Sequence, residues 1–244
     1  DCNSYSVRTF RDAMEAIEEG AADYAVLPIE NSTAGAVNEV YDLLVEFENY
    51  IVGEVIIPIT HTLAGLPGTQ LSELKRVYSK AEALMQTTRF LEEHSDWQQL
   101  SVANTAIAAK KILDDQDRTQ AAVCSAYAAK VYGLEVLEDN INDESGNCTR
   151  FIIVTNQKVF LKGAKKISIC FEVPHESGSL YHLLSHFIYN DLNMSKIESR
   201  PIEGRSWEYR FFVDFEGNLE EPGVKNALRG LREESRSLKI LGNY

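Results

Sequence analysis

Three short stretches of the sequence place hydroxyl, amide or guanidinium groups beside apolar runs. In residues 143–154, a polar loop leads to Thr149 and Arg150, which directly precede the apolar run 151–154. A short run rich in β-branched residues predicts a buried strand, and ligands of α/β proteins often bind where loops meet strand ends. Arginine is the preferred partner of a carboxylate because its planar fork donates two hydrogen bonds. The stretch therefore predicts either an ordinary strand edge or a binding site.

The second stretch, "PIENSTAG" at residues 28–35, lies between a predicted strand and a predicted helix. In the simpler interpretation, Asn31 or Ser32 is the N-cap of that helix and has no other role. In the alternative, the free N–H groups at the helix start also attract a carboxylate or a phosphate. The residue types alone leave both interpretations open.

The third stretch, "VYSKAEALMQ", contains Ser79, Glu82 and Gln86. A serine followed three residues later by glutamate is the pattern of a capping box, which would give Ser79 a sufficient structural role. Gln86 lies two helical turns further along, on a broadly similar face of the predicted helix. Such a residue is usually solvated, but together with Ser79 it could also bind a polar ligand.

Metal and cofactor motifs are poorly represented. His182 and His186 have the i, i+4 spacing that could hold a metal on a helix, but no motif supplies a third ligand, so a packing or solvated pair is preferred. The sequence has no H-E-x-x-H, P-loop, G-x-G-x-x-G or G-x-S-x-G motif. We therefore expect chemistry without a cofactor, or simple binding.

Composition limits the classes of partner. A formal net charge of −13 argues against binding to nucleic acid or to an anionic membrane, and no lysine or arginine occurs between Arg11 and Lys75. No apolar run approaches the roughly 20 residues of a membrane-spanning helix, and the first residues do not resemble a signal peptide. The four cysteines are scattered, and Cys124 and Cys170 lie in apolar runs, which indicates free thiols and a cytoplasmic protein.

The order of predicted elements suggests how these residues are positioned. Up to residue 154, strand-like runs alternate with helical segments, the pattern of a parallel α/β sheet. We expect two such lobes, with the chain crossing near residue 60 and returning near 140. After a linker at residues 156–165, the pattern changes to strand, helix, two strands in a hairpin, helix and strand. This βαββαβ order predicts a ferredoxin-like unit.

Several stretches in the same order resemble prephenate dehydratase with a C-terminal ACT regulatory domain. They are "LPIENSTAG", "VYS" followed by Gln86, "NCTRFIIV", "GSLYHLL" and "IESRPIEGRSWEYRFFVDFEG", and they extend over nearly the whole chain. The resemblance implies an α/β catalytic region of two periplasmic-binding-protein-like lobes at 1–157, enclosing the active cleft, and an ACT domain at 165–244. It also implies removal of CO2 and the ring hydroxyl from prephenate to give phenylpyruvate, without a cofactor, in a homodimer or homotetramer that L-phenylalanine inhibits.

By the same resemblance, the catalytic residues are Thr149, Arg150, Asn31, Ser79 and Gln86. Four of them (Asn31, Ser79, Thr149 and Arg150), together with Ser32, would also bind the substrate. Thr149 would assist departure of the hydroxyl, and Arg150 would either bind a substrate carboxylate or lock its loop. The phenylalanine-binding residues would be Gly178, Ser179, Leu180, Glu198, Ser199, Arg200 and Pro201.

The sequence departs from the family pattern in three places. The family's opening strand and its Gly-Pro-rich loop have no counterpart here, so part of the cleft is expected to be missing from this chain. Lys80 stands where the family commonly has histidine, and "GSL" replaces the usual "GAL". Two alternatives remain: an arogenate dehydratase, which shares the motifs, and an amino-acid sensor that does not need Thr149. A chorismate mutase domain upstream of Asp1 also stays open.

Overall fold

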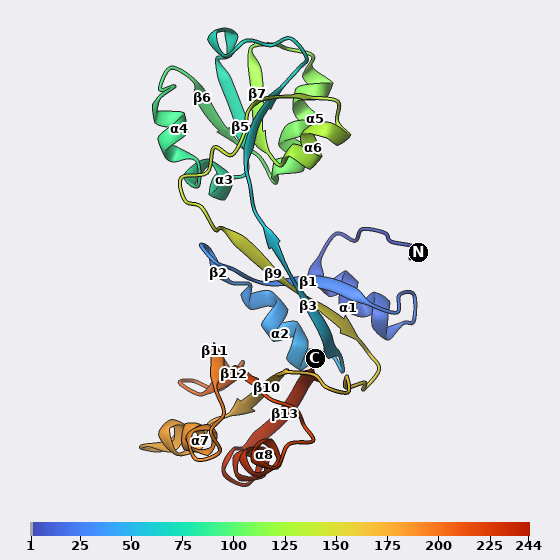
Figure 1. Ribbon diagram of the computed structural model, residues 1–244, viewed down its shortest axis with the longest axis vertical. Helices are drawn as coiled ribbons and strands as arrows, with labels where there is room; N and C mark the ends of the chain where they lie inside the picture. Colours follow the sequence, from blue (N-terminus) through green and yellow to red (C-terminus); the bar gives the residue numbers. More distant parts are fainter. Residues whose placement is uncertain (1) are drawn as a thin grey trace. The chain divides into compact units, whose positions relative to one another are not determined.

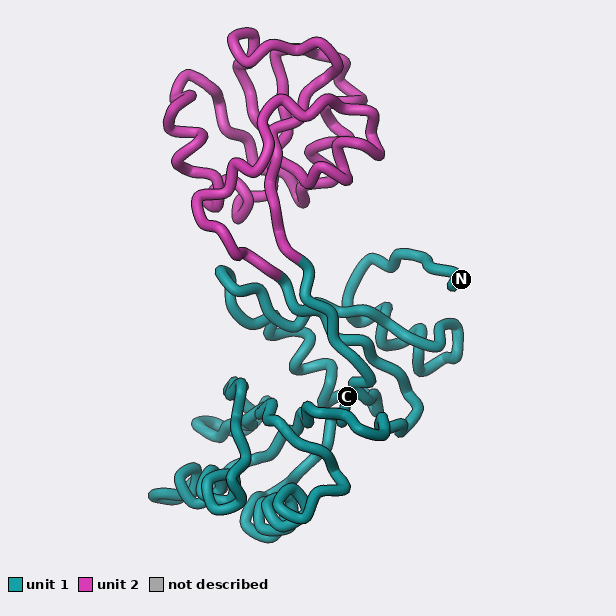
Figure 2. Tube along the Cα trace, viewed as in Figure 1, with its two compact units in different colours: residues 1–57, 149–244 teal, residues 58–148 magenta. Residues whose placement is uncertain are grey.

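A computed structural model describes residues 2–244, and these residues form two compact units. Unit 1 contains residues 1–57 and 149–244, and unit 2 contains residues 58–148 (Figure 2). The chain therefore leaves unit 1 at residue 57 and re-enters it at residue 149, close to the two crossings expected from the sequence.

Unit 1 is built on one eight-stranded sheet, with strand order β11-β12-β10-β13-β3-β9-β1-β2 (Figure 1). The strands are β1 (Ala25–Asn31), β2 (Gly35–Ala36), β3 (Tyr50–Pro58), β9 (Cys148–Thr155), β10 (Lys166–Glu172), β11 (Met194–Pro201), β12 (Tyr209–Glu216) and β13 (Ser237–Asn243). The helices are α1 (Phe10–Glu18), α2 (Asn38–Glu46), α7 (Ser179–Ile188) and α8 (Pro222–Glu234).

Two apolar cores cover opposite faces of the C-terminal part of this sheet. Cys170 belongs to the core formed with α1 and α2, whereas its neighbours Ile169 and Phe171 belong to the core formed with α7 and α8. Successive side chains of a strand point to opposite faces, so the two helix pairs lie on opposite sides. The ring of Tyr41 in α2 packs 4.8 Å from the ring of Phe212 in β12, which ties the first core to the C-terminal strands.

Residues 166–243, named here the C-terminal module, have the βαββαβ order that the sequence predicts. β11 and β12 form the expected antiparallel hairpin, and β10 lies between β12 and β13. The sequence did not predict that this module shares its sheet with the rest of unit 1. The junction is a parallel contact between β13 and β3, where Gly242 lies opposite Ile51.

Unit 2 has a five-stranded sheet with strand order β6-β5-β7-β4-β8. Its strands are β4 (Thr62–Gly65), β5 (Arg76–Ser79), β6 (Gln98–Ser101), β7 (Gln120–Cys124) and β8 (Glu135–Glu138). Its helices are the 3-10 turn η1 (Leu71–Glu73), α3 (Ala81–Met85), α4 (Thr88–Glu92), α5 (Thr105–Asp115) and α6 (Ala126–Val131). Within residues 2–244, no helix is both long and apolar enough to cross a membrane.

Both sheets are mixed, which corrects the expectation of parallel sheets. In unit 2, β5 is parallel to β6 and β7, but β4 runs antiparallel to both β7 and β8. In unit 1, β9 runs antiparallel to β1. The antiparallel strands include β4 and β9, each of which follows a crossing between the units. A strand reached by such a crossing is not preceded by the helical crossover that makes neighbouring strands parallel.

The buried cysteines give a testable consequence of this packing. Cys124 and Cys170 are buried as predicted, whereas Cys2 is exposed. Burial raises the pKa of the Cys124 and Cys170 thiols to about 11. The thiolate is the nucleophile, and at pH 8 only about one in a thousand of these thiols is ionised, so their alkylation is slow. We expect iodoacetamide to alkylate Cys2 first and to reach the two buried thiols only after unfolding, as measured by mass spectrometry. Equal labelling rates in the native protein would contradict this packing.

Candidate functional site

The candidate residues of unit 1 meet where β1 and β9 lie side by side. Asn31 lies directly opposite Thr149 in this antiparallel pair, and its Nδ2 donates a hydrogen bond of 2.9 Å to the Thr149 Oγ1. The Asn31 Oδ1 accepts from the backbone N–H groups of Thr33 (3.0 Å) and Ala34 (2.9 Å), which fixes the orientation of the carboxamide. Because the Thr149 hydroxyl oxygen accepts this bond, its proton can be donated to another group.

The structure corrects the interpretation of Asn31 or Ser32 as a helix N-cap. β1 continues to Asn31, a tight turn follows, and β2 precedes α2. The N-cap of α2 is Val37, which makes no side-chain capping bond. Asn31 instead stabilises the turn through its side-chain oxygen, a common use of asparagine where the chain reverses. Ser32 lies exposed in that turn.

Arg150 is engaged by carboxylates of the protein itself. Its terminal nitrogens lie 2.7 Å from Asp214 Oδ2, 3.2 Å from Glu30 Oε2 and 3.3 Å from Glu54 Oε2. Burial alone would lower the pKa of Arg150, but the charge of Asp214 and its hydrogen bond outweigh burial and raise that pKa. Of the two roles that the sequence left open, this geometry favours locking of the strand over contact with a substrate.

Ser79 of unit 2 lies at the end of β5 and is fully buried. Its hydroxyl donates a hydrogen bond of 2.6 Å to the carbonyl oxygen of Val123 in the neighbouring β7. The capping-box interpretation is therefore wrong, because α3 begins at Ala81 and its N-cap is Lys80, without a side-chain capping bond. The donor of Ser79 is committed, so towards a ligand this hydroxyl can act as an acceptor.

Gln86 connects two residues that the sequence analysis did not identify. Its Oε1 accepts a 3.0 Å hydrogen bond from Asn147 Nδ2 and lies 2.9 Å from His61 Nε2. With the oxygen held in this way, the amide nitrogen of Gln86 remains as a donor. His61 and Asn147 are both buried, at 5% and 8% exposure. Each lies just before a strand, β4 or β9, and polar residues at strand ends were the available signal.

The residues expected to bind phenylalanine divide between two places in the C-terminal module. Ser179 and Leu180 line a cavity of about 170 Å³, together with Trp207 and Tyr209. Gly178 precedes α7 with φ 81°, a left-handed conformation that suits glycine.

The other four expected residues lie on β11: Glu198, Ser199, Arg200 and Pro201. Arg200 donates two hydrogen bonds to Asp42 of α2, from Nε to Oδ1 at 3.0 Å and from Nη2 to Oδ2 at 2.6 Å. Glu198 lies 3.9 Å from Lys196 on the same strand. The structure therefore places Ser179 and Leu180 in a cavity and uses Arg200 to attach β11 to α2.

Metal ligation has no obvious place in the part of the chain that the structure describes. No group of three or more histidine, cysteine, aspartate or glutamate residues within residues 2–244 is arranged to hold a metal ion. Of the two histidines on α7, His186 lies 3.2 Å from Glu234 of α8. The His186–Glu234 pair is therefore described as a contact between α7 and α8.

Comparisons with a family model and with known sequences agree on one family. The sequence model of the family described as prephenate dehydratase matches residues 1–159. A bifunctional chorismate mutase/prephenate dehydratase of Aquifex aeolicus is 40% identical over 238 residues, which is 97% of this chain and 65% of that protein. The chain thus spans less than two thirds of the length of this relative.

Two solved structures are similar over almost the whole chain. A prephenate dehydratase from Arthrobacter aurescens in complex with L-Phe has a TM-score of 0.88 and 33% identity, covering 97% of this chain and 79% of that one. A structure described as GqqA, a novel type of quorum quenching acylase, also has a TM-score of 0.88, with 32% identity, covering 97% of this chain and 86% of that one.

Proposed function

Because the chain belongs to the prephenate dehydratase family, we propose that it converts prephenate to phenylpyruvate in the synthesis of phenylalanine. The observation that carries the proposal is the Asn31–Thr149 hydrogen bond of 2.9 Å. It leaves a hydroxyl proton available at the mouth of β9, which is the group that the reaction requires.

The reaction needs no redox step. The bond from the ring to the carboxylate breaks, and its electron pair becomes part of the aromatic ring as the ring hydroxyl leaves on the far side. That hydroxyl takes up a proton, so the products are phenylpyruvate, CO2 and water. Aromatisation supplies the driving force, and the protein has to orient a dianion and assist the leaving group. Thr149, polarised by Asn31, donates or relays that proton.

The test of this proposal is an assay of the purified full-length protein. Prephenate and arogenate are supplied separately, and formation of phenylpyruvate or phenylalanine is followed. Phenylpyruvate from prephenate is the expected result. Turnover of arogenate alone would change the substrate to the aminated analogue. The same preparation is also assayed as an acylase, because the chain is similar to the structure described as an acylase. Absence of all turnover would contradict the proposal and leave a sensor.

We also propose that the C-terminal module is an ACT domain that binds L-phenylalanine as a feedback inhibitor. The support is its βαββαβ order, the cavity beside Ser179 and Leu180, and a related structure that contains L-Phe. The cavity lies at the start of α7, and a helix N-terminus suits the carboxylate of an amino acid. We expect added phenylalanine to suppress phenylpyruvate formation. Unchanged turnover at millimolar phenylalanine would contradict a regulatory role.

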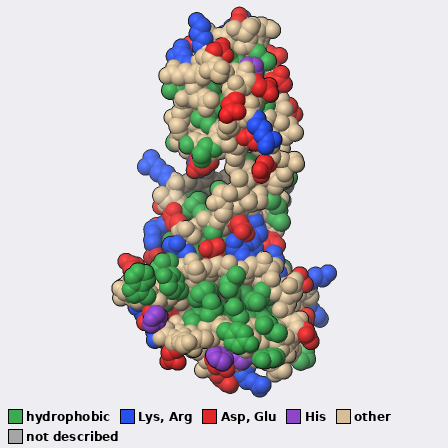
Figure 3. Space-filling model, turned by 90° about the vertical axis from the view of Figure 1, so that its left-hand side faces the viewer, with side chains coloured by type: hydrophobic (Ala, Val, Ile, Leu, Met, Phe, Trp, Pro, Cys, Tyr) green, Lys and Arg blue, Asp and Glu red, His purple; other side chains and the backbone are tan. Residues whose placement is uncertain are grey.

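We further propose that the protein forms a homodimer or homotetramer in the cytoplasm. The C-terminal module exposes large apolar side chains: Tyr181, Ile188, Tyr189, Ile197, Trp207 and Tyr209. Figure 3 shows hydrophobic side chains gathered on one face of this module, in the lower part of the view. Apolar surface gathered in this way is typical of an interface between proteins.

A further inference from the structure

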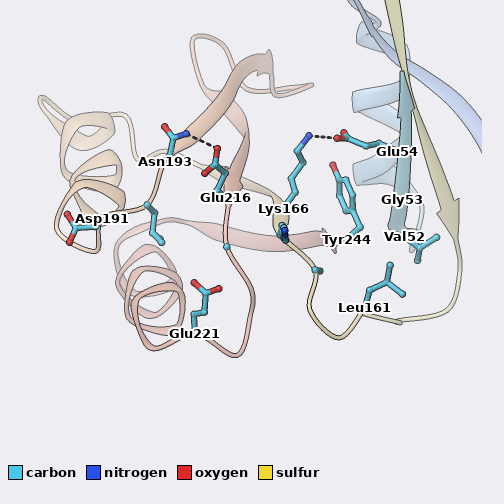
Figure 4. Close-up of a pocket in the computed structure, with 14 residues that line it drawn as sticks. Val52, Gly53, Glu54, Leu161, Lys166, Asp191, Asn193, Glu216, Glu221 and Tyr244 are labelled. Atoms are coloured by element: carbon cyan, nitrogen blue, oxygen red, sulfur yellow. Dashed lines mark hydrogen bonds and ion pairs between the residues drawn. The ribbon is translucent and has the colours of Figure 1, made fainter. Parts of the chain in front are cut away.

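A cluster of charged residues lies on the face of β9 that carries Arg150. We name it the Arg150 cluster; its members are Arg150, Glu30, Glu54, Lys166, Lys196 and Asp214. Lys196 donates to Glu30 at 2.6 Å, and Lys166 contacts Glu54 beside a cavity of about 810 Å³ (Figure 4). Three of the six residues, Lys166, Lys196 and Asp214, belong to the C-terminal module.

Two adjacent residue pairs of β1 and β9 face opposite sides of the sheet. Glu30 lies opposite Arg150, and Asn31 lies opposite Thr149. Because successive side chains alternate between faces, the ionic pair points to one side and the amide–hydroxyl pair to the other. The ion pairs that hold the Arg150 side chain on its face also restrain the backbone of β9. Because Thr149 is the neighbouring residue, they restrain its position on the opposite face as well.

Asp214 makes the shortest contact with Arg150, at 2.7 Å, and both side chains are only 13% exposed. The other carboxylate oxygen of Asp214 accepts a 2.6 Å hydrogen bond from Ser168, whose Oγ is also 2.9 Å from the Tyr244 hydroxyl. Each carboxylate oxygen of Asp214 therefore has a partner, Arg150 for one and Ser168 for the other, and these contacts fix the orientation of the carboxylate.

The Arg150 cluster includes one buried polar atom without a partner within residues 2–244. Arg150 Nε is one of the few buried side-chain nitrogens in the described residues that have no hydrogen-bond partner. A buried donor without a partner costs free energy, and buried ion pairs are often less stabilising than apolar packing. A cluster that carries this cost next to Thr149 is consistent with a positioning role.

We propose that Asp214 is a positioning residue for the dehydratase reaction, acting through Arg150 to hold the Thr149 hydroxyl against Asn31. The inference rests on the proposed function and extends it, because it makes the C-terminal module part of the scaffold of the catalytic strand. The module therefore supports turnover even when no phenylalanine is bound.

The experiment compares Asp214→Asn with a matched control, Glu172→Gln. Glu172 is also a buried carboxylate of the C-terminal module, and it contacts Arg205 and Arg210 instead of β9. A misplacement of about 1 Å can lower turnover roughly 100-fold, so we expect Asp214→Asn to lower kcat on the order of 10- to 100-fold with KM within about threefold. Glu172→Gln is expected to keep kcat within about twofold, although both variants lose thermal stability.

A double-mutant cycle and hydrogen exchange test whether Asp214 acts through Arg150. If Asp214 acts through Arg150, adding Arg150→Lys to Asp214→Asn lowers kcat little further than either single change. The amides of residues 148–151 exchange faster with solvent in Asp214→Asn but not in Glu172→Gln, whether or not prephenate is the substrate. An inactive wild-type protein would overturn the proposed function alone. Unchanged kcat and exchange in Asp214→Asn, or equal losses in both variants, would overturn the positioning role.

Discussion

Replacing Thr149 with alanine is expected to lower kcat for prephenate by about 10²- to 10⁴-fold, the usual contribution of a positioned proton donor. The substitution removes the only side-chain group of Thr149 that accepts from Asn31 Nδ2 and that can donate to a leaving hydroxyl. Substrate binding relies on other groups as well, so KM should change much less than kcat. Thr149→Ser keeps the hydroxyl and should retain most of the turnover.

Thr155→Ala is the matched control for this prediction. Thr155 is the last residue of β9, is 4% exposed, and its hydroxyl makes a weak contact of 3.4 Å with the backbone N–H of Gln157. Both variants remove one hydroxyl and one methyl group from the same strand, so thermal melting reports the stability cost of each, while only Thr149→Ala is expected to affect chemistry. Steady-state kinetics and thermal melting of both variants provide the comparison. Full turnover in Thr149→Ala would remove this residue from the mechanism.

The Thr149→Ala variant also distinguishes an enzyme from a sensor. Thr149 lies in β9, whereas the cavity beside Ser179 and Leu180 belongs to the C-terminal module. Loss of turnover with unchanged phenylalanine binding, measured by calorimetry, is therefore the result expected for a regulated enzyme. A sensor would keep its complete biological effect in Thr149→Ala.

The sequence predicted the elements of the fold better than the contacts between them. The apolar run after Arg150 became β9, and the βαββαβ order of the C-terminal module was read from periodicity alone. The cap assignments of Asn31 and Ser79 failed because local signals competed with distant partners. Ser79 donates to Val123, 44 residues away, and Asn31 to Thr149, 118 residues away. No local pattern contains such pairings.

Arg150 shows the same limit for the candidate site. The sequence identified the residue and left two roles open, since a guanidinium at a strand mouth suits a ligand carboxylate and a protein carboxylate equally. The decision depends on Asp214, which comes from a strand 64 residues further along the chain. His61 was not identified for a similar reason, because its partner Gln86 is placed by the packing of unit 2.

The second large effect is expected at Gly242, where the C-terminal module joins β3. A Cβ atom at this position would lie 2.2 Å from the carbonyl oxygen of Ile51 and 2.9 Å from its Cβ. Backbone cannot move aside as a flexible side chain does, so β13 and β3 would have to separate. We expect Gly242→Ala to destabilise unit 1 by about 3 kcal/mol, the upper range for overpacking a core. For a chain of this size that corresponds to a fall in Tm of roughly 6 to 12 °C.

Gly53→Ala is the control for this close approach, because Gly53 lies on β3, the strand that Gly242 approaches at Ile51. A Cβ atom there would meet Ile153 Cδ1 at 3.5 Å, an ordinary van der Waals contact. That substitution should change stability by less than about 1 kcal/mol, since alanine also restricts the unfolded chain. Calorimetric melting of the two variants gives the comparison. If both melted with the wild type, the strands at Gly242 could separate without cost, and the β13–β3 contact would not hold the C-terminal module to β3. A fall confined to Gly242→Ala, together with lower kcat, would indicate that this junction helps to keep Asp214 in reach of Arg150.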